Sequence, residues 1–261
     1  MDDTWEVGGA YDTFMGRWSR LVALEFLQWL AVPDGKRWLD VGCGTGMLSR
    51  CILESTNPLR VTGIDPAPGF VSYAAETTAD NRASFHQGTA TSTGIADASV
   101  DAVVSGLALN FVPDPAASLP EMKRVVEPGG MIAAYVWDYA AGMQFLRYFW
   151  DAAVALDPDA APLDEGIRFP LCNPDRLVEL FKEQGLPDTV VRHIDIPTTF
   201  TSFDDYWAPF LAGQGPAPGY VSSLSDTRKE ALRERLRSLL PVSRDGSIEL
   251  SARAWTVRGR V

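Results

Sequence analysis

The sequence is poor in cysteine and histidine. Its 261 residues include three cysteines and two histidines. Cys43, Cys51 and Cys172 form neither a disulfide framework nor the spacing of a zinc site, so we expect reduced thiols and no metal. His86 and His193 each fall in an expected strand without the partners that an acid–base dyad requires. Disulfide-stabilised folds, zinc modules and catalysis by a histidine dyad are therefore disfavoured.

Long apolar runs and an excess of basic charge are also missing. No stretch of about eighteen apolar residues occurs, and the acidic start Met1-Asp2-Asp3 is unlike a signal peptide, so we expect a cytoplasmic protein without membrane insertion. The net charge is −11, from 34 acidic and 23 basic residues. Since binding of a phosphate backbone needs a basic surface, no nucleic-acid partner is expected. The basic residues within 225–240 alternate with leucines at helical spacing, which predicts a solvated helix face.

The most informative stretch that is present covers residues 38–46. An apolar strand beginning at Trp38 runs into Asp-Val-Gly-Cys-Gly-Thr-Gly, and a helical pattern follows over 47–53. Glycines at positions 42, 44 and 46 permit positive φ and let main-chain N–H groups approach a ligand closely. A strand, a glycine turn and a helix in this order predict a site for a nucleotide-like cofactor.

The spacing of these glycines separates two classes of cofactor. A dinucleotide fingerprint requires its third glycine at position 47, which is Met47, so a nicotinamide oxidoreductase is disfavoured. The stretch from Asp40 to Gly46 resembles motif one of the class I methyltransferases, which use S-adenosylmethionine (SAM) and release S-adenosylhomocysteine (SAH). The resemblance implies cofactor contacts at Asp40, Gly42, Cys43 and Gly44. A glycine turn that serves only chain reversal is the alternative interpretation.

A second short apolar strand, residues 60–65, ends in a carboxylate. Asp65 follows the glycine turn by about twenty residues, the length of one βαβ unit. A carboxylate at that point can accept hydrogen bonds from two ribose hydroxyls. The resemblance assigns this role to Asp65 and places Pro66 against the adenine ring, whereas a solvated acid is the alternative.

The third expected strand, residues 84–88, leads into a departure from the family pattern. Related methyltransferases usually follow the glycine with an aspartate that binds the adenine amino group, and this chain has Thr89. A neutral hydroxyl makes a weaker hydrogen bond than a carboxylate. The resemblance therefore implies an adenine contact at Thr89 of reduced strength, with the backbone of Ala90 supplying part of the recognition.

A fourth strand is expected over 100–105, and the residues after it resemble motif four of small-molecule methyltransferases. The resemblance implies Leu107 at the cofactor and Asn110 at the substrate. The Asn-Pro-Pro-Tyr and Pro-Cys signatures of DNA-base methyltransferases are missing. We further expect a helix that starts or kinks at Pro120 and ends at Glu127, since Pro128 follows, and then a strand over 131–137.

The N-terminal segment carries an apolar stripe at helical spacing, from Trp18 to Leu30. In the family such a leading segment often folds over the cofactor. The resemblance then implies contacts from Tyr11 and Arg17 to the sulfonium side and the methionine carboxylate. A helix that simply packs on the core is the alternative.

The C-terminal half predicts helices over 142–156, 174–183, 203–211 and 225–240, strands over 189–197 and 252–260, and a flexible loop over 212–219. Its helices are rich in aromatic residues. Together with Trp137, the side chains of Phe145 and Trp207 are candidates to line an apolar substrate chamber. Ordinary core packing is the alternative and can account for most of these aromatics.

These patterns predict an α/β fold: a Rossmann-like, seven-stranded, mostly parallel sheet with helices on both faces, an antiparallel last strand and a helical cap. We expect a lid segment over 1–33, a SAM-binding core over 34–138, and the rest of the sheet with cap insertions over 139–261. The resemblance is to the type 11 branch, related to ubiquinone and menaquinone methyltransferases. It implies methyl transfer to a small, apolar or aromatic molecule. A methyltransferase-like accessory protein without turnover is the alternative, and the acceptor atom and oligomeric state stay open.

Overall fold

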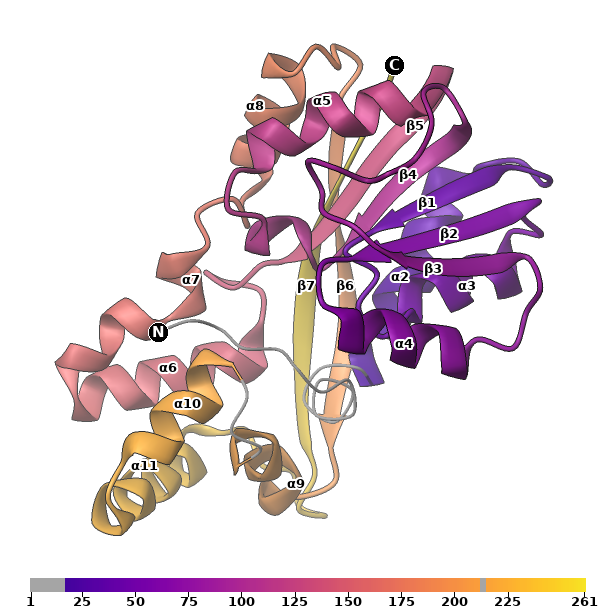
Figure 1. Ribbon diagram of the computed structural model, residues 1–261. Helices are drawn as coiled ribbons and strands as arrows, with labels where there is room; N and C mark the ends of the chain where they lie inside the picture. Colours follow the sequence, from indigo (N-terminus) through magenta and orange to yellow (C-terminus); the bar gives the residue numbers. More distant parts are fainter. Residues whose placement is uncertain (1–16, 212–214) are drawn as a thin grey trace.

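The fold is built on a seven-stranded sheet with strand order β3-β2-β1-β4-β5-β7-β6 (Figure 1). The computed structural model describes residues 17–211 and 215–261. The strands are β1 (Arg37–Val41), β2 (Arg60–Asp65), β3 (Ala83–Gln87), β4 (Val100–Gly106), β5 (Val126–Trp137), β6 (Val190–Phe200) and β7 (Ile248–Arg260). The first five pair in parallel, while β7 is antiparallel to both β5 and β6. This confirms the predicted fold, including its antiparallel last strand.

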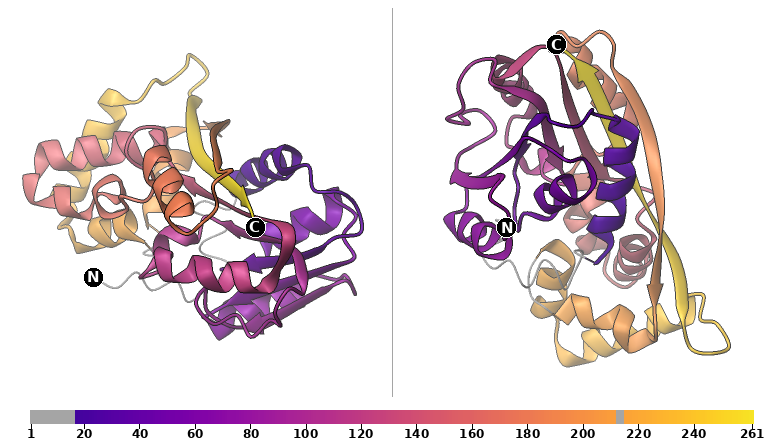
Figure 2. Two further views of the ribbon diagram at one scale, coloured as in Figure 1. Left: turned by 90° about the horizontal axis from the view of Figure 1, so that it is seen from above. Right: turned by 90° about the vertical axis from the view of Figure 1, so that its right-hand side faces the viewer.

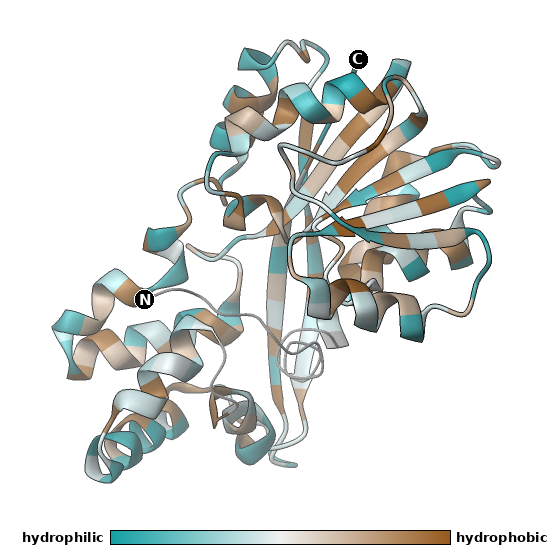
Figure 3. Cartoon of the chain, viewed as in Figure 1, coloured by the Kyte–Doolittle hydropathy of each residue, from teal (hydrophilic) through white to brown (hydrophobic). Residues whose placement is uncertain are grey.

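Helices cover both faces of the sheet (Figure 2). They are α2 (Arg17–Leu30), α3 (Met47–Ser55) and α4 (Pro68–Thr77) on one side, and α5 (Pro115–Val125) and α8 (Pro174–Glu183) on the other. The central strands β1 and β4 are buried along nearly their whole length, as expected for parallel strands covered on both faces. In Figure 3 apolar residues accordingly run along β4 and β5, whereas the outer helix α11 (Asp226–Leu239) is mostly hydrophilic.

The remaining helices form a cap at one end of the sheet (Figure 1). One insertion, between β5 and β6, contains α6 (Gln144–Leu156), η3 (Pro158–Leu163) and α7 (Glu165–Arg168) ahead of α8. A second insertion, between β6 and β7, contains α9 (Phe203–Trp207), η4 (Ala208–Leu211), α10 (Pro216–Ser223) and α11. Helix α6 packs against both α10 and α11, so the two insertions share one core.

Stacked aromatic rings make up that cap core. Phe145 contacts the rings of Phe200, Tyr206 and Phe210, and Phe149 stacks on Phe210 with centroids 4.4 Å apart. All of these side chains are fully buried. Aromatic rings attract one another in offset-stacked and edge-to-face contacts. This cluster is therefore the structural centre of the cap.

Several expected boundaries are corrected by the structure. The helix expected to end at Glu127 ends at Val125, because Val126 already belongs to β5. It begins at Pro115 behind the N-cap Asp114 and contains Pro120 in its interior, so Pro120 is not its start. Within the expected loop 212–219, residues from Pro216 onward form the first turn of α10.

Neither a helix suited to cross a membrane nor a metal-binding cluster occurs in the described part of the chain. None of its helices combines the length and hydropathy that a membrane crossing needs. In residues 17–211 and 215–261 there is no cluster of three or more His, Cys, Asp or Glu side chains that could hold a metal ion. On α11 the guanidinium groups of Arg228 and Arg233 pair with Asp157 and Asp204 of other segments, and the 69% exposure of the Arg228 side chain agrees with a solvated helix face.

Candidate functional site

A cavity of about 760 Å³ opens where the carboxyl ends of β1, β2 and β4 meet. In open α/β sheets ligands bind at this edge. Every predicted cofactor residue whose side chain the structure describes lines the cavity, namely Asp40, Gly42, Cys43, Gly44, Asp65, Pro66, Thr89, Ala90 and Leu107. Tyr11 lies outside the described residues, and Arg17 is described only as the first backbone position of α2. The sequence motifs thus converge on one concave site.

The glycine turn between β1 and α3 forms one wall of the cavity. Gly42, Gly44 and Gly46 have φ values of 73°, 50° and 81°, which side-chain-bearing residues rarely adopt. A Cβ added at Gly42 would lie 2.5 Å from the Cβ of Ala108, whereas one at Gly44 would meet nothing within 4 Å. Glycine at 42 is therefore needed for close packing, and glycine at 44 leaves the main chain open to a ligand.

Asp65 ties the end of β2 to this turn. Its Oδ2 accepts a hydrogen bond from the Gly44 N–H at 3.0 Å, and its Oδ1 accepts one from the Ala67 N–H at 2.9 Å. Burial raises the pKa of Asp65, while the two backbone bonds act in the opposite direction. Because a carboxylate has about four acceptor positions, these two contacts leave room for ligand hydroxyls.

Asp40 is a second carboxylate on the cavity wall, and it is only 1% exposed. Its Oδ2 accepts a hydrogen bond from the Ser49 hydroxyl at 2.7 Å. Its Oδ1 is buried and has no hydrogen-bond partner among the described residues. Burial, with a smaller contribution from the charge of Asp65, raises the pKa of Asp40 to about 7. A buried acceptor without a partner is costly, and Asp40 Oδ1 therefore suits a hydrogen-bond donor on a bound ligand.

The segment after β3 closes the cavity on the side of β2. The N–H of Thr89 donates to the Ser92 carbonyl at 3.1 Å, and the N–H of Ser92 donates back to the Thr89 carbonyl at the same distance. Gly88 and the first three residues of this turn line the cavity. The Thr89 and Thr91 hydroxyls lie 3.3 Å apart. The Thr89 hydroxyl, at the position where related methyltransferases usually have an aspartate, therefore has a hydrogen-bonding neighbour within the turn.

The other side of the cavity is apolar. Met47, Phe70, Leu107, Phe111, Val112 and Pro113 contribute to it. The ring of Phe111 is 39% exposed and packs edge-on against Phe169 with centroids 5.0 Å apart. Leu107 has a φ of 57°, an uncommon conformation for a leucine, at the point where β4 ends. An apolar surface beside a polar turn allows a ligand of mixed character to bind.

Tyr135 and Ser19 also line the cavity but were not predicted from the sequence. Tyr135 on β5 pairs in register with Gly106 on β4, and a Cβ added at Gly106 would lie 2.6 Å from the tyrosine hydroxyl. The glycine therefore makes room for the phenol. A glycine at the end of one strand and an aromatic residue on the next strand were the available signal, which only the strand register turns into a contact.

The residues expected to contact substrate lie elsewhere. Asn110, Trp137, Phe145 and Trp207 are not among the residues that line the cavity. Trp137, Phe145 and Trp207 are buried in the molecule's core, and the rings of Phe145 and Trp207 pack against other rings of the cap. The Oδ1 and Nδ2 atoms of Asn110 are buried without hydrogen-bond partners among the described residues. A substrate contact at any of these positions remains a prediction.

Comparison with known proteins agrees with this geometry. Residues 39–134 match the family profile described as a methyltransferase domain. This segment is a methyltransferase domain. It contains the glycine turn, Asp65 and the turn at Thr89, and a class I methyltransferase domain implies SAM as the cofactor.

Relatives with assigned names extend the similarity beyond the methyltransferase domain. The chain is 32% identical over 187 residues to the 2-methyl-6-phytyl-1,4-hydroquinone methyltransferase of Synechocystis, a match that covers 70% of this chain and 57% of the relative. It is 37% identical over 139 residues to a human thiol S-methyltransferase, covering 51% and 54% of the two chains. It is 36% identical over 105 residues to the demethylmenaquinone methyltransferase of Staphylococcus aureus, covering 40% and 44%. The chain thus spans about half the length of the curated relatives it matches.

Solved structures share the fold around the methyltransferase domain at low sequence identity. The phosphoethanolamine N-methyltransferase 2 of Haemonchus contortus, in complex with SAH, superposes with a TM-score of 0.59 at 18% identity, covering 97% of this chain and 56% of that chain. The [4+2]-cyclase SpnF superposes with a TM-score of 0.54 at 17% identity, covering 92% and 81%. Proteins of different stated activity therefore share this architecture.

Proposed function

We propose that this protein is a SAM-dependent methyltransferase that acts on a small, apolar or aromatic molecule. The observation that carries the proposal is that the glycine turn, Asp65, Thr89 and the apolar side chains near Phe111 all line one cavity. A cavity of about 760 Å³ falls within the range of roughly 300–1,000 Å³ typical of small-molecule sites. It has room for a nucleoside cofactor with an acceptor beside it.

The residues of the cavity suggest how the cofactor would lie. Asp65 has free acceptor positions for the ribose hydroxyls, and the open backbone at Gly44 lies directly beside it. The buried and unpartnered Oδ1 of Asp40 suits the ammonium group of the methionine tail. Pro66, Thr89 and Ala90 are then left for the adenine end. SAM supplies an activated methyl group on a sulfonium, which transfers to a nucleophile in line with the leaving sulfur.

The chain's own contribution to the reaction is positioning and exclusion of water. Fixing two reactants in line can lower a barrier by about 7–11 kcal/mol relative to their encounter in solution. Phe70, Phe111, Val112 and Pro113 offer an apolar surface for an acceptor next to the cofactor site. No histidine lines the cavity wall described, which agrees with transfer to an acceptor that is already nucleophilic or ionised.

The named relatives support the substrate class. One is named for a hydroquinone, one for demethylmenaquinone and one for thiols. Hydroquinones and thiols ionise more readily than alcohols, and a phytyl hydroquinone is largely apolar. We therefore propose a phenolic, quinol or thiol acceptor and place it over the side chains near Phe111.

Calorimetry followed by a turnover assay tests the proposal. The protein should bind SAM and SAH and should not bind NADH, and radiolabelled methyl transfer should be detected with at least one member of a panel of quinols, phenols and thiols. Binding of NADH instead of SAH would contradict the cofactor assignment. Tight binding of SAH without transfer to any member of the panel would favour an accessory protein.

A second candidate, a protein of this fold that binds SAM without methyl transfer, is favoured by one specific observation. The structural neighbour SpnF is a [4+2]-cyclase, so the architecture alone does not determine the reaction. Product analysis separates the two candidates, because only a methyltransferase converts SAM to SAH in proportion to methylated product.

A further inference from the structure

The turn that closes the adenine side of the cavity is held from behind by helix α5. The turn residues Thr89, Thr91 and Ser92 are exposed, whereas Thr93, which follows directly, is 3% exposed. An exposed turn that bonds mainly to itself depends on its ends for its position. Thr93 therefore anchors the turn: contacts between Thr93 and the rest of the fold can determine the position of this cavity wall.

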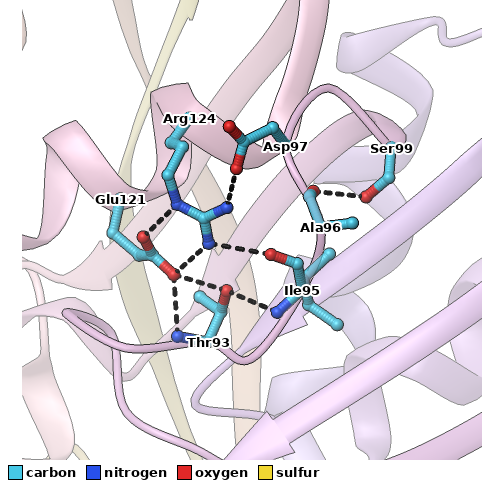
Figure 4. A network of polar contacts seen from close by, with 7 residues as sticks. All are labelled: Thr93, Ile95, Ala96, Asp97, Ser99, Glu121 and Arg124. Atoms are coloured by element: carbon cyan, nitrogen blue, oxygen red, sulfur yellow. Dashed lines mark hydrogen bonds and ion pairs between the residues drawn. The ribbon is translucent and has the colours of Figure 1, made fainter.

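Glu121 of α5 binds that anchor with one carboxylate oxygen (Figure 4). Its Oε1 accepts hydrogen bonds from the Thr93 N–H at 2.9 Å and from the Thr93 hydroxyl at 2.7 Å. The Thr93 hydroxyl oxygen in turn accepts the Ile95 N–H at 3.2 Å. Three consecutive contacts thus fix the backbone immediately behind the turn.

Arg124, one turn further along α5, completes the arrangement shown in Figure 4. Its Nε donates to Glu121 Oε2 at 2.7 Å, and its terminal nitrogens bind Glu121 Oε1, the Ile95 carbonyl and the Asp97 carboxylate. The neighbouring guanidinium and the Thr93 donors lower the pKa of Glu121 to about 2. The carboxylate consequently stays charged throughout the physiological range, and hydrogen bonds to a charged acceptor are the stronger kind.

The same helix also holds the opposite, apolar side of the cavity. Asp114, the N-cap of α5, lines the cavity together with Val112 and Pro113, and its Oδ1 accepts the Ala117 N–H at 3.1 Å. Helix α5 is thus joined at its start to one wall and through Glu121 to the other. Its own contacts are with β5 and α8, away from the cavity.

We propose that Glu121 and Thr93 are positioning residues for cofactor binding: they set the Thr89–Ser92 turn against the adenine end of the ligand without touching it. This inference rests on the proposed function. It assigns a role to residues outside the glycine motif.

The decisive variants change single atoms of this contact. Glu121→Gln keeps an acceptor oxygen but removes the charge, and Thr93→Val removes only the hydroxyl. Loss of one hydrogen bond to a charged group corresponds to about a tenfold change in an equilibrium constant, so each variant should raise the Kd for SAH about tenfold. Thr93→Ser, which retains both donors, should bind SAH with the Kd of the wild type. Asp97→Asn is the matched control, because Asp97 is 79% exposed and contacts Arg124 only from the outside.

The effect should concentrate on the adenine end. 5′-Methylthioadenosine, which lacks the amino acid tail, should lose affinity by the same factor as SAH, and the KM for SAM should rise while kcat changes little. A Kd for SAH equal to that of the wild type in Glu121→Gln and Thr93→Val would overturn the inference. A fall in kcat together with a loss of thermal stability, at an unchanged KM, would also overturn it, because a purely structural role would produce that result.

Hydrogen exchange separates this inference from the proposed function. In the protein without ligand, Glu121→Gln should speed amide exchange at residues 89–93 and leave the glycine turn at 42–46 unchanged. If the wild type binds no SAH, the proposed function is wrong, while faster exchange at 89–93 would still establish the anchoring. Unchanged exchange at 89–93 would refute the anchoring whether or not SAH binds.

Discussion

The region around the cofactor cavity and the helical cap use their side chains for opposite purposes. Around the glycine turn a few small or polar side chains are exposed to a cavity, and the backbone has positive φ at Gly42, Gly44 and Gly46. In the cap many large aromatic side chains are withdrawn from solvent and from that cavity. The first region holds buried polar groups without partners, such as Asp40 Oδ1, and the second satisfies its rings internally.

This contrast teaches where substitutions should act. Changes around the cofactor cavity should alter ligand binding more than stability, since the key groups of that region face the cavity. Changes in the cap core should alter stability more than cofactor binding. Substitutions in each region test that division.

Phe145→Ala should destabilise the protein by about 3–5 kcal/mol, because it removes a fully buried ring and leaves a cavity in the cap. Urea unfolding followed by fluorescence measures the change. Leu156→Ala on the same helix is the control and should cost little, since Leu156 is 49% exposed. If the folded Phe145→Ala protein also binds SAH many-fold more weakly, the cap and the cofactor site are not separable in this way.

Asp65→Ala should weaken SAM binding by about 2–3 kcal/mol, because it removes a charged acceptor and leaves the Gly44 and Ala67 N–H groups without it. Calorimetry measures the affinity. Asp65→Asn, which retains one acceptor oxygen, should fall between the wild type and the alanine variant. Wild-type affinity in Asp65→Ala would remove Asp65 from the site.

Asp40→Asn should flatten the dependence of stability on pH. Burial raises the pKa of Asp40 to about 7 in the folded protein, against about 4 for an unfolded aspartate. Between these values the folded state keeps a proton that the unfolded state has lost, so the contribution of Asp40 to stability is full below about pH 4 and declines as the pH rises to about 7. The asparagine variant lacks this decline.

The difference in unfolding free energy between Asp40→Asn and the wild type should therefore change by about 3 kcal/mol between pH 4 and pH 7. Urea titrations at four pH values measure it. Asp80→Asn serves as the control, because Asp80 is ion-paired with Arg82 at the surface and its pKa is lowered instead. Parallel pH profiles for Asp40→Asn and the wild type would mean that Asp40 is ionised in the folded protein.

Thr89→Asp should tighten SAM binding by a few tenths of a kcal/mol to about 1 kcal/mol, since a charged acceptor replaces a hydroxyl at the adenine end. Calorimetry at low ionic strength measures this gain, and Thr91→Asp at the neighbouring turn position is the control. Equal or weaker binding in Thr89→Asp would show that the adenine amino group is recognised elsewhere.

The sequence predicted the sheet, its antiparallel last strand and a set of residues that line one cavity because those signals are local. The glycines from 42 to 46 and Asp65 stand at strand ends, where a few neighbouring residues determine the conformation. Boundaries that depend on tertiary pairing were wrong: Val126 leaves α5 because it pairs with Val100 in the sheet, which no helix-stop signal encodes.

The unpredicted part of the site depends on contacts between distant segments. Tyr135 reaches the cavity only because Gly106 lies beside it on the next strand, while Phe70 comes from α4 and Phe111 from the 3-10 turn after β4. The composition of the cap shows many aromatic residues, but it does not show which way their side chains point. Whether Phe145 faces a ligand or Phe210 is decided by how two insertions pack together, which periodicity within either insertion does not determine.

The placement of β7 between β5 and β6 has a consequence for how the chain folds. Met131 of β5 pairs with Arg260, and Phe200 of β6 pairs with Ile248, so the second half of the sheet closes only when the last strand arrives. Pairings between residues so far apart in the chain slow folding, because the loop entropy is lost before the contacts form. Both cap insertions are enclosed by these pairings. We therefore expect the β1–β4 unit to acquire protection early in refolding, with the cap and the β5–β7–β6 ladder following in one slower, cooperative step.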